Sequence, residues 1–120
     1  MTELTITRPD DWHVHLRDGT ALPATCGDMA RYFGRGIVMP NLTPPVTTVA
    51  LALAYRERLL AAMADQPRQF DPLMVLYLTD QTEPQEIARA AASEHVHGVK
   101  LYPAGATTNS DAGVAQLDGL

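Results

Sequence analysis

Four short extended segments alternate with longer segments of helical periodicity along this chain. The short segments are residues 11–16, 36–39, 73–78 and 98–102. Strands that are mainly apolar on both faces are typical of parallel sheets covered by helices, and parallel neighbours need a long crossover connection. The alternation therefore predicts an α/β fold with a parallel sheet. A further extended segment at residues 4–7 could precede the first strand.

Three helices are expected between these strands. A helix capped by Thr47 or Thr48 should direct four residues of helical spacing towards a core, namely Val49, Leu53, Leu60 and Met63. A second helix is expected over residues 87–94, after a capping-box spacing that starts at Thr82. A third is expected over residues 21–33.

Four strand-helix units amount to about half of a (β/α)₈ barrel, whose usual size is ~250 residues. The 120 residues are therefore expected to supply about the first four strand-helix units of such a barrel. An open half-barrel exposes a parallel edge on each side, so we expect it to need a continuation, a partner chain or dimerisation. The alternative is a small open-sheet α/β domain that is complete by itself.

Composition excludes several function classes. The formal net charge of −5 and the pI near 5.1 argue against nucleic-acid binding, which requires a basic face. A single cysteine, Cys26, allows no internal disulfide and fits a reducing cytosol, where we expect it to be a packing residue. The N-terminus lacks the basic start and the apolar core of a signal peptide, so secretion is not expected. No apolar run reaches the length of about 20 residues that a membrane span needs.

Two histidines separated by one residue, His13 and His15, lie on the first expected strand. Side chains alternate between the faces of a strand, so both rings can reach one ion. Neutral imidazole is the commonest metal ligand in proteins, and a bound divalent ion can make hydroxide from water near neutral pH. His95 and His97 repeat this spacing at the start of the fourth strand, the stability end of a barrel, and are interpreted as surface or packing residues.

Lys100 lies between Val99 and Leu101, so alternation turns it towards the barrel interior. Burial disfavours the ammonium form and frees some amine, which can add carbon dioxide to form a carbamate. A carbamate is an anionic oxygen ligand that can bridge two metal ions. The alternative is an interior lysine paired with an acid. Taken together with the two histidines, the lysine favours a metal site.

Three segments, residues 8–18, 38–48 and 100–110, resemble the bacterial-type dihydroorotases of the amidohydrolase superfamily. The resemblance runs from about Thr7 to the end of the chain, with the three motifs in the order of that family. It implies the N-terminal half of one metal-dependent hydrolase barrel domain of the TIM type, spanning residues 1–120. The implied enzyme cyclises N-carbamoyl-L-aspartate reversibly to L-dihydroorotate in pyrimidine biosynthesis. A cytoplasmic homodimer with two zinc ions per active site is also implied.

The resemblance assigns roles to individual residues. His13 and His15 would bind the more buried zinc, and Lys100, as the carboxylated catalytic residue, would bridge both ions. The residues assigned to substrate binding are His15, Leu16, Arg17 and Asn41. Thr107 and Thr108 match a mobile loop that closes over the substrate. Arg17 offers a planar fork of donors for a carboxylate, and the Asn41 amide donates without adding charge.

Two alternative functions remain open from the sequence. Another cyclic amidohydrolase, such as a hydantoinase or allantoinase, would share the histidines and the lysine, although Arg17 and Asn41 argue against it. A non-catalytic metal-binding or assembly module is the other alternative. It is favoured if the chain ends naturally at Leu120, because residues 1–120 do not include the two further histidines and the aspartate that the family's site takes from later strands. Three smaller expectations concern Trp12 in the core, Asp18 orienting Arg17, and loop capping by Thr79 and Asp80.

Overall fold

Each strand of the sheet pairs with the strand that follows it in the sequence. The computed structural model describes residues 2–120, whose elements in chain order are β1 (Asp10–Val14), η1 (Gly19–Ala21), α1 (Leu22–Tyr32), β2 (Arg35–Val38), α2 (Val49–Ala62), β3 (Asp71–Leu78), α3 (Pro84–Ala92), β4 (Val96–Leu101) and η2 (Leu117–Gly119). The strands form one parallel sheet in the order β1-β2-β3-β4, which confirms the predicted α/β class. Residues 4–7 form no strand, although an extended segment there could have been one.

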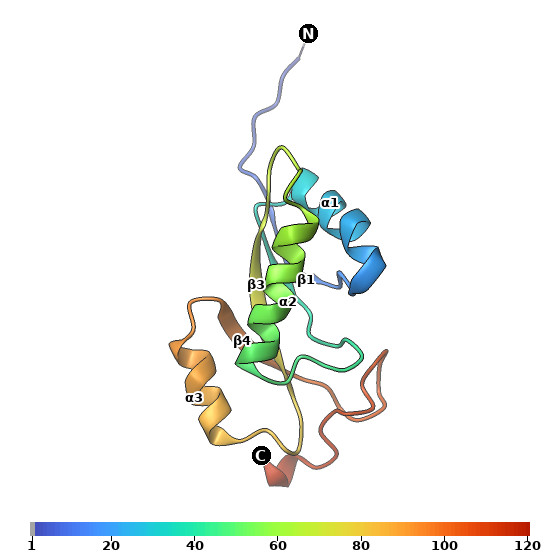
Figure 1. Ribbon diagram of the computed structural model, residues 1–120, viewed down its shortest axis with the longest axis vertical. Helices are drawn as coiled ribbons and strands as arrows, with labels where there is room; N and C mark the ends of the chain where they lie inside the picture. The colour runs from blue at the N-terminus through green and yellow to red at the C-terminus, as the bar shows by residue number, and fades with distance from the viewer. Residues whose placement is uncertain (1) are drawn as a thin grey trace.

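The three helices lie on the same side of the sheet (Figure 1). Helix α2 packs on β3 and between α1 and α3, and α3 packs on β4. Crossovers between parallel neighbours are right-handed as a rule, and helices on one side of sequentially ordered strands are the arrangement of successive units in a (β/α)₈ barrel. Within residues 2–120, β4 is followed by a loop and the short η2 rather than by a fourth α-helix. The chain therefore supplies three complete units and the fourth strand.

Helix α2 presents its buried stripe differently from the expectation. Thr48 caps it as predicted, because its hydroxyl accepts a hydrogen bond from Leu51 N at 3.1 Å. Met63 is buried and Val49 and Leu60 border the core, but Leu53 is 37% exposed. The fully buried positions within the helix are Ala52, Tyr55 and Leu59. Tyr55 shifts the stripe, because a tyrosine ring can be buried once its hydroxyl has a partner, here the Arg17 carbonyl oxygen.

The predicted capping box of α3 is wrong. The helix begins at Pro84 with Glu83 as its N-cap, and no side chain caps it. The Thr82 hydroxyl instead accepts a hydrogen bond from Thr79 N at 2.9 Å and stabilises the turn after β3. Proline suits the first helical turn, where its missing N–H would have no intrahelical partner.

Leu59→Ala should lower the free energy of unfolding by about 2–5 kcal/mol, because the leucine is fully buried and alanine leaves a cavity. Leu53→Ala on the same helix removes the same atoms from a position that is 37% exposed, so its effect should stay below about 1 kcal/mol. Urea denaturation followed by circular dichroism measures both values. Equal effects for the two substitutions would contradict this position of the buried stripe.

The sheet has two unpaired edges within the described residues, β1 and β4. Trp12 on β1 is 51% exposed, and the Arg35 guanidinium lies 5.0 Å from the centre of the Trp12 ring. The prediction that Trp12 is a core residue is therefore wrong. The β1–β2 register shifts between Asp11 and Val14, which breaks strict alternation at this residue.

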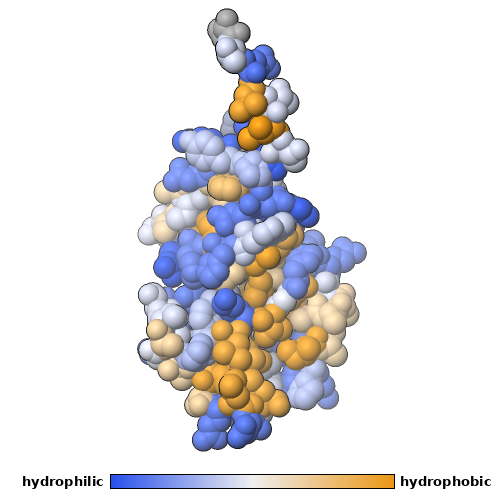
Figure 2. All heavy atoms as spheres, turned by 180° about the vertical axis from the view of Figure 1, so that it is seen from behind, coloured by the Kyte–Doolittle hydropathy of each residue, from blue (hydrophilic) through white to orange (hydrophobic). Residues whose placement is uncertain are grey.

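The side of the molecule behind the helices carries hydrophobic surface across its centre and lower half (Figure 2). No helix among residues 2–120 has the length and apolarity to span a membrane.

Candidate active site

A cavity of about 370 Å³ lies where the polypeptide leaves β1, β2 and β4. Its lining residues are His13, His15, Arg17, Asn41, Lys100, Leu101, Tyr102, Pro103, Thr107 and Thr108. Three segments far apart in the sequence thus meet at the carboxyl ends of the strands, the edge at which parallel α/β folds bind ligands. The lining contains two basic side chains and no carboxylate, which makes the cavity suitable for an anion.

The two histidine rings point at one another across the β1 exit. Their Nε2 atoms are 3.1 Å apart, and the Asp11 carboxylate accepts a hydrogen bond from His13 N at 3.0 Å. Two imidazole nitrogens on one tetrahedral zinc, each about 2.0–2.1 Å from it, would lie roughly 3.3 Å apart. Burial, followed by the charges of Arg17 and His13, lowers the pKa of His15 and favours its neutral, ligating form. The pair therefore fits a metal ion.

The described residues supply only part of a ligand set. Among residues 2–120 no group of three His, Cys, Asp or Glu side chains lies close enough to hold an ion. Lys100 pairs in register with Tyr77 of β3 and lines the same cavity as the two rings. Its Nζ is 5.9 Å from the centre of the Tyr102 ring, and no acid of the described chain forms an ion pair with it. The structure therefore gives no support to the alternative of a lysine paired with an acid.

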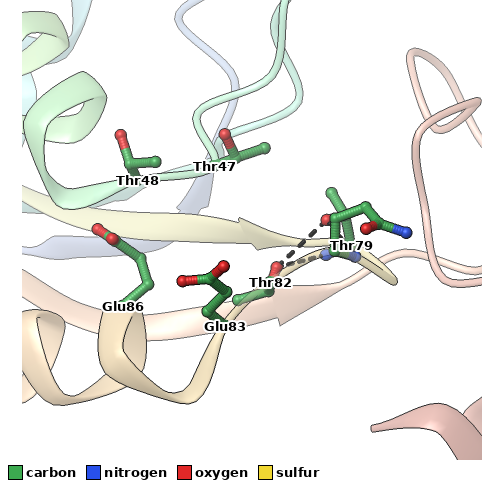
Figure 3. Close-up of a pocket in the computed structure, with 7 residues that line it drawn as sticks. Thr47, Thr48, Thr79, Thr82, Glu83 and Glu86 are labelled. Carbon is green, nitrogen blue, oxygen red and sulfur yellow. Dashed lines mark hydrogen bonds between the residues drawn. The ribbon is translucent and has the colours of Figure 1, made fainter.

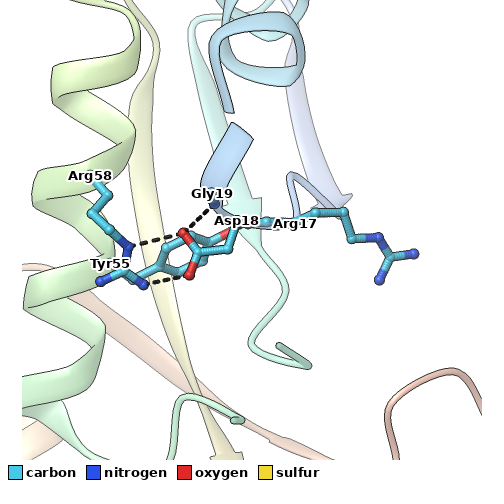
Figure 4. A network of polar contacts seen from close by, with 5 residues as sticks. All are labelled: Arg17, Asp18, Gly19, Tyr55 and Arg58. Carbon is cyan, nitrogen blue, oxygen red and sulfur yellow. Dashed lines mark hydrogen bonds and ion pairs between the residues drawn. The ribbon is translucent and has the colours of Figure 1, made fainter. Parts of the chain in front are cut away.

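Arg17 has a backbone φ of 61°, which is uncommon for a residue with a side chain. Its side chain extends away from α2 (Figure 4) and lines the cavity. Asp18 does not orient it as expected. The Asp18 carboxylate instead accepts two hydrogen bonds from Arg58, both at 2.9 Å. Burial raises the pKa of Asp18, but the hydrogen bonds from Arg58 and Gly19 N outweigh it and hold this pKa below its usual value.

Asn41 connects the cavity to the loop after β4. Its side chain is buried, and Nδ2 donates to the Thr108 carbonyl oxygen at 2.9 Å. Asn109 returns a hydrogen bond from its Nδ2 to the Asn41 carbonyl oxygen at 3.1 Å, and the Tyr77 hydroxyl donates to Asn109 O at 3.3 Å. The loop therefore rests on the rim of the cavity in this structure.

Leu16 is the one predicted site residue that does not line the cavity. Its side chain is 2% exposed and belongs to the hydrophobic core, and its carbonyl oxygen accepts a hydrogen bond from the Thr25 hydroxyl at 2.9 Å. A residue between two cavity-lining neighbours points to the opposite face of an extended chain. The Leu16 side chain therefore anchors the β1 exit to the core. His95 and His97, interpreted as surface or packing residues, also lie outside the cavity.

Tyr102 and Ser110 are parts of this region that sequence reasoning missed. The Tyr102 ring stacks on Tyr77 with centroids 4.7 Å apart, and burial, then Tyr77, raises its pKa to about 12. Its hydroxyl is buried without a hydrogen-bond partner in the described chain. Alternation from Lys100 could have assigned Tyr102 to the same face. Ser110 is fully buried and holds the loop by bonds to Thr107 N (2.8 Å) and Thr107 O (2.7 Å), a local turn with no periodic signal.

Gly113→Ala should displace the loop over residues 103–116. A Cβ at this position would lie 2.2 Å from Tyr102 O and 2.9 Å from Ser110 O, both backbone atoms that cannot move independently. We expect faster cleavage of the loop in limited proteolysis, because the added methyl group would push the loop away from the backbone of Tyr102 and Ser110. Gly119→Ala is the control, because a Cβ there would meet nothing within 4 Å. An unchanged rate of cleavage in the Gly113 variant would contradict the close packing of Gly113 against the backbone of Tyr102 and Ser110.

A second cavity of about 240 Å³ lies between the N-terminal ends of α2 and α3 (Figure 3). Its lining residues are Thr47, Thr48, Thr79, Gln81, Thr82, Glu83 and Glu86. Several of these groups already have partners. Glu86 accepts hydrogen bonds from Val49 N and from Arg89, both at 2.7 Å, and Thr79 accepts one from Gln81 N at 3.1 Å. We therefore interpret this cavity as a junction of helix caps and turns, and the loop capping expected of Thr79 fits this interpretation.

The family of the chain follows from comparison with known sequences. The sequence profile described as "Amidohydrolase family" matches residues 8–117, which is nearly the whole chain. The chain belongs to the amidohydrolase family. Among relatives of this amidohydrolase, the dihydroorotase of Cupriavidus taiwanensis is 70% identical over 115 residues, covering 96% of this chain and 33% of that protein. The dihydroorotase of Ralstonia nicotianae is 69% identical over 114 residues, with 95% and 33% covered.

Solved structures similar to this amidohydrolase agree with that assignment. The dihydroorotase of Campylobacter jejuni superposes with a TM-score of 0.80 at 38% identity, covering 91% of this chain and 31% of that one. The dihydroorotase of Saccharomyces cerevisiae in complex with 5-fluoroorotic acid gives a TM-score of 0.77 at 36% identity, with 88% and 28% covered. The chain thus spans about a third of the length of the curated relatives that it matches.

Proposed function

We propose that this amidohydrolase chain is the N-terminal half, residues 1–120, of the barrel domain of a dihydroorotase. The proposed reaction is the reversible cyclisation of N-carbamoyl-L-aspartate to L-dihydroorotate, with loss of one water, in pyrimidine biosynthesis. The observation that carries the proposal is the single cavity shared by His13, His15, Arg17, Asn41 and Lys100. Similarity to dihydroorotases at up to 70% identity supports it. A cytoplasmic homodimer without nucleic-acid or membrane partners remains part of the proposal.

The proposed metal ligands are His13, His15 and Lys100. Both ring nitrogens face one point at the β1 exit, and the lysine amine can gain a carboxylate oxygen by adding carbon dioxide and releasing a proton. Two bound zinc ions, bridged by the carboxylated lysine, would supply Lewis acidity and lower the pKa of a bound water. The lysine is thereby the proposed catalytic residue. The remaining ligands would come from residues outside this chain.

The proposed substrate contacts use the other residues of the cavity. Arg17 would hold a substrate carboxylate through two parallel hydrogen bonds, and it forms no ion pair within the described chain. Asn41 would donate its amide to the same group, and His15 would border the substrate. Leu16 would contribute through its backbone at the β1 exit. Thr107 and Thr108 would close over the substrate and exclude water.

The two alternatives differ in what they need from the cavity. A hydantoinase or allantoinase substrate lacks the carboxylate that Arg17 and Asn41 would bind, so their presence beside Lys100 favours dihydroorotase. A metal-binding module needs only the histidines and the lysine. The basic character of the cavity therefore favours an anionic substrate over both alternatives.

Turnover by the purified full-length protein tests the proposal. We expect conversion of N-carbamoyl-L-aspartate and of L-dihydroorotate in opposite directions, and no conversion of hydantoin or allantoin, when products are separated by liquid chromatography. Metal analysis should find two zinc equivalents, and native mass spectrometry a labile 44 Da adduct, the mass of carbon dioxide, on about one lysine per chain. Conversion of hydantoin or allantoin alone would replace this function by the first alternative, and bound metal without any turnover would favour the second.

A further inference from the structure

Arg17 lies in a turn that its own sequence does not favour. Arg17 and Gly19 both have φ of 61°, and Asp18 between them is extended. Glycine tolerates the left-handed region, but a side chain at that φ is disfavoured by contact with its own backbone. Such a conformation persists where the surrounding structure over-determines it, and this happens most often at functional sites.

Two residues of α2, one helical turn apart, hold this turn from the side opposite the cavity (Figure 4). The Tyr55 hydroxyl donates a hydrogen bond to the Arg17 carbonyl oxygen. Arg58 donates from Nε and Nη2 to the two oxygens of Asp18, each at 2.9 Å, and Asp18 in turn accepts from Gly19 N at 2.9 Å. The Arg58 guanidinium also lies 5.2 Å from the centre of the Tyr55 ring. The two contacts therefore form one connected cluster.

The hydrophobic core holds the Tyr55 side chain more firmly than a side chain on the surface would be held. This side chain is fully buried in the core stripe of α2, and burial strongly raises the pKa of its hydroxyl, which stays protonated and can only donate to the carbonyl. On the other side of the peptide, the Arg17 side chain points into the cavity. Holding the carbonyl thus sets the direction in which the side chain leaves the backbone.

We propose that Tyr55 and Arg58 are positioning residues, which clamp the turn of residues 17–19 and thereby hold the Arg17 guanidinium ready for a substrate carboxylate. This rests on the proposed function, in which Arg17 binds that carboxylate. Neither residue lines the cavity, so each acts only through the turn. Pre-organisation of this kind improves binding, because the cost of ordering the side chain is met during folding.

Steady-state kinetics of the full-length protein test the clamp. Tyr55→Phe keeps the buried ring and removes only the hydroxyl, and Arg58→Met removes the two hydrogen bonds to Asp18. We expect each to raise KM for N-carbamoyl-L-aspartate roughly five- to tenfold, the size of one lost hydrogen bond, with kcat changed less than about twofold. In an Arg17→Ala background the effect of Tyr55→Phe should vanish, because residues that act through one group are not additive.

Two matched controls separate this role from general destabilisation. Tyr32→Phe removes the hydroxyl of a tyrosine that is 59% exposed on α1. Arg35→Met removes the Arg35–Asp10 pair, in which the guanidinium also donates two hydrogen bonds to one carboxylate. This pair lies at the first residues of β1 and β2, at the other end of the strands from the cavity. Both should leave KM unchanged. A KM unchanged in both clamp variants, or a Tyr55→Phe effect that persists without Arg17, overturns the proposal.

A crystal structure of the Tyr55→Phe protein gives a readout that needs no substrate. We expect Arg17 to leave the left-handed region and its guanidinium to leave the cavity. An unchanged Arg17 φ and side-chain position would overturn the clamp. If the wild-type protein converts neither compound, the proposed function fails, and this structural result alone decides the present inference.

Discussion

Lys100→Ala is expected to lower kcat of the full-length protein by roughly 10³-fold or more, which is about 4 kcal/mol of activation free energy. The amine lines the cavity beside the two histidines and has no acidic partner in the described chain, so its proposed use is as a carboxylated ligand. Its loss should also remove bound zinc. Kinetics and metal analysis on the same samples measure both effects.

Lys100→Glu is the informative comparison for this prediction. Glutamate supplies a carboxylate without carbon dioxide, so it should retain more metal than alanine does, whereas Lys100→Arg keeps a positive charge and should retain none. Lys100 is the single lysine among these 120 residues, which simplifies assignment of a carbon dioxide adduct in peptides from this region. Full zinc content and activity in the alanine variant would refute the metal role of the lysine.

Arg17→Ala should raise KM for N-carbamoyl-L-aspartate by about 10²-fold, because it removes a charge-assisted, two-point contact with a carboxylate. Zinc content should stay unchanged, since Arg17 is not among the proposed ligands. Arg17→Lys should recover only part of the affinity, because an ammonium cannot reproduce the planar fork. Michaelis–Menten kinetics in both directions, with zinc analysis, provide the measurement.

Arg31→Ala serves as the control for the loss of a cation. Arg31 lies in the last turn of α1, exposed beside Tyr32 and outside the cavity, so its removal should leave KM as it is. Loss of zinc from the Arg17 variant without a change of KM would move Arg17 from substrate binding to the metal site. An equal rise of KM in both variants would indicate a long-range electrostatic effect instead.

The parts of the fold that depend on local pattern were predictable. Extended segments at residues 36–39 and 73–78 became β2 and β3, and the Thr48 cap became the start of α2, because propensity, periodicity and capping are properties of neighbouring residues. The observed strand order agrees with the expected half of a (β/α)₈ barrel, in which each strand pairs with the next. Of the residues singled out for the site, all but Leu16 line one cavity, because the ends of parallel strands meet at one edge.

Three of the errors concern residues whose environment is set by distant parts of the chain. Leu53 had the right spacing for the core, but the partner that Tyr55 finds at Arg17 shifted the buried face of α2. Trp12 sits where the β1–β2 register shifts, and alternation cannot predict a bulge. Asp18 was linked to its neighbour Arg17, whereas the group that binds it, Arg58, lies 40 residues away. No spacing rule reports a contact of that range.

Tyr55 belongs to two parts of the molecule at once, since its ring fills the interior while its hydroxyl holds the turn that carries Arg17. Small displacements of α2 would therefore be transmitted to the ligand-facing surface without any melting of the sheet. Substitutions elsewhere in the interior that merely loosen this helix would then weaken substrate capture while leaving the protein folded. In such variants we expect substrate binding to be lost on heating at temperatures below the midpoint of unfolding.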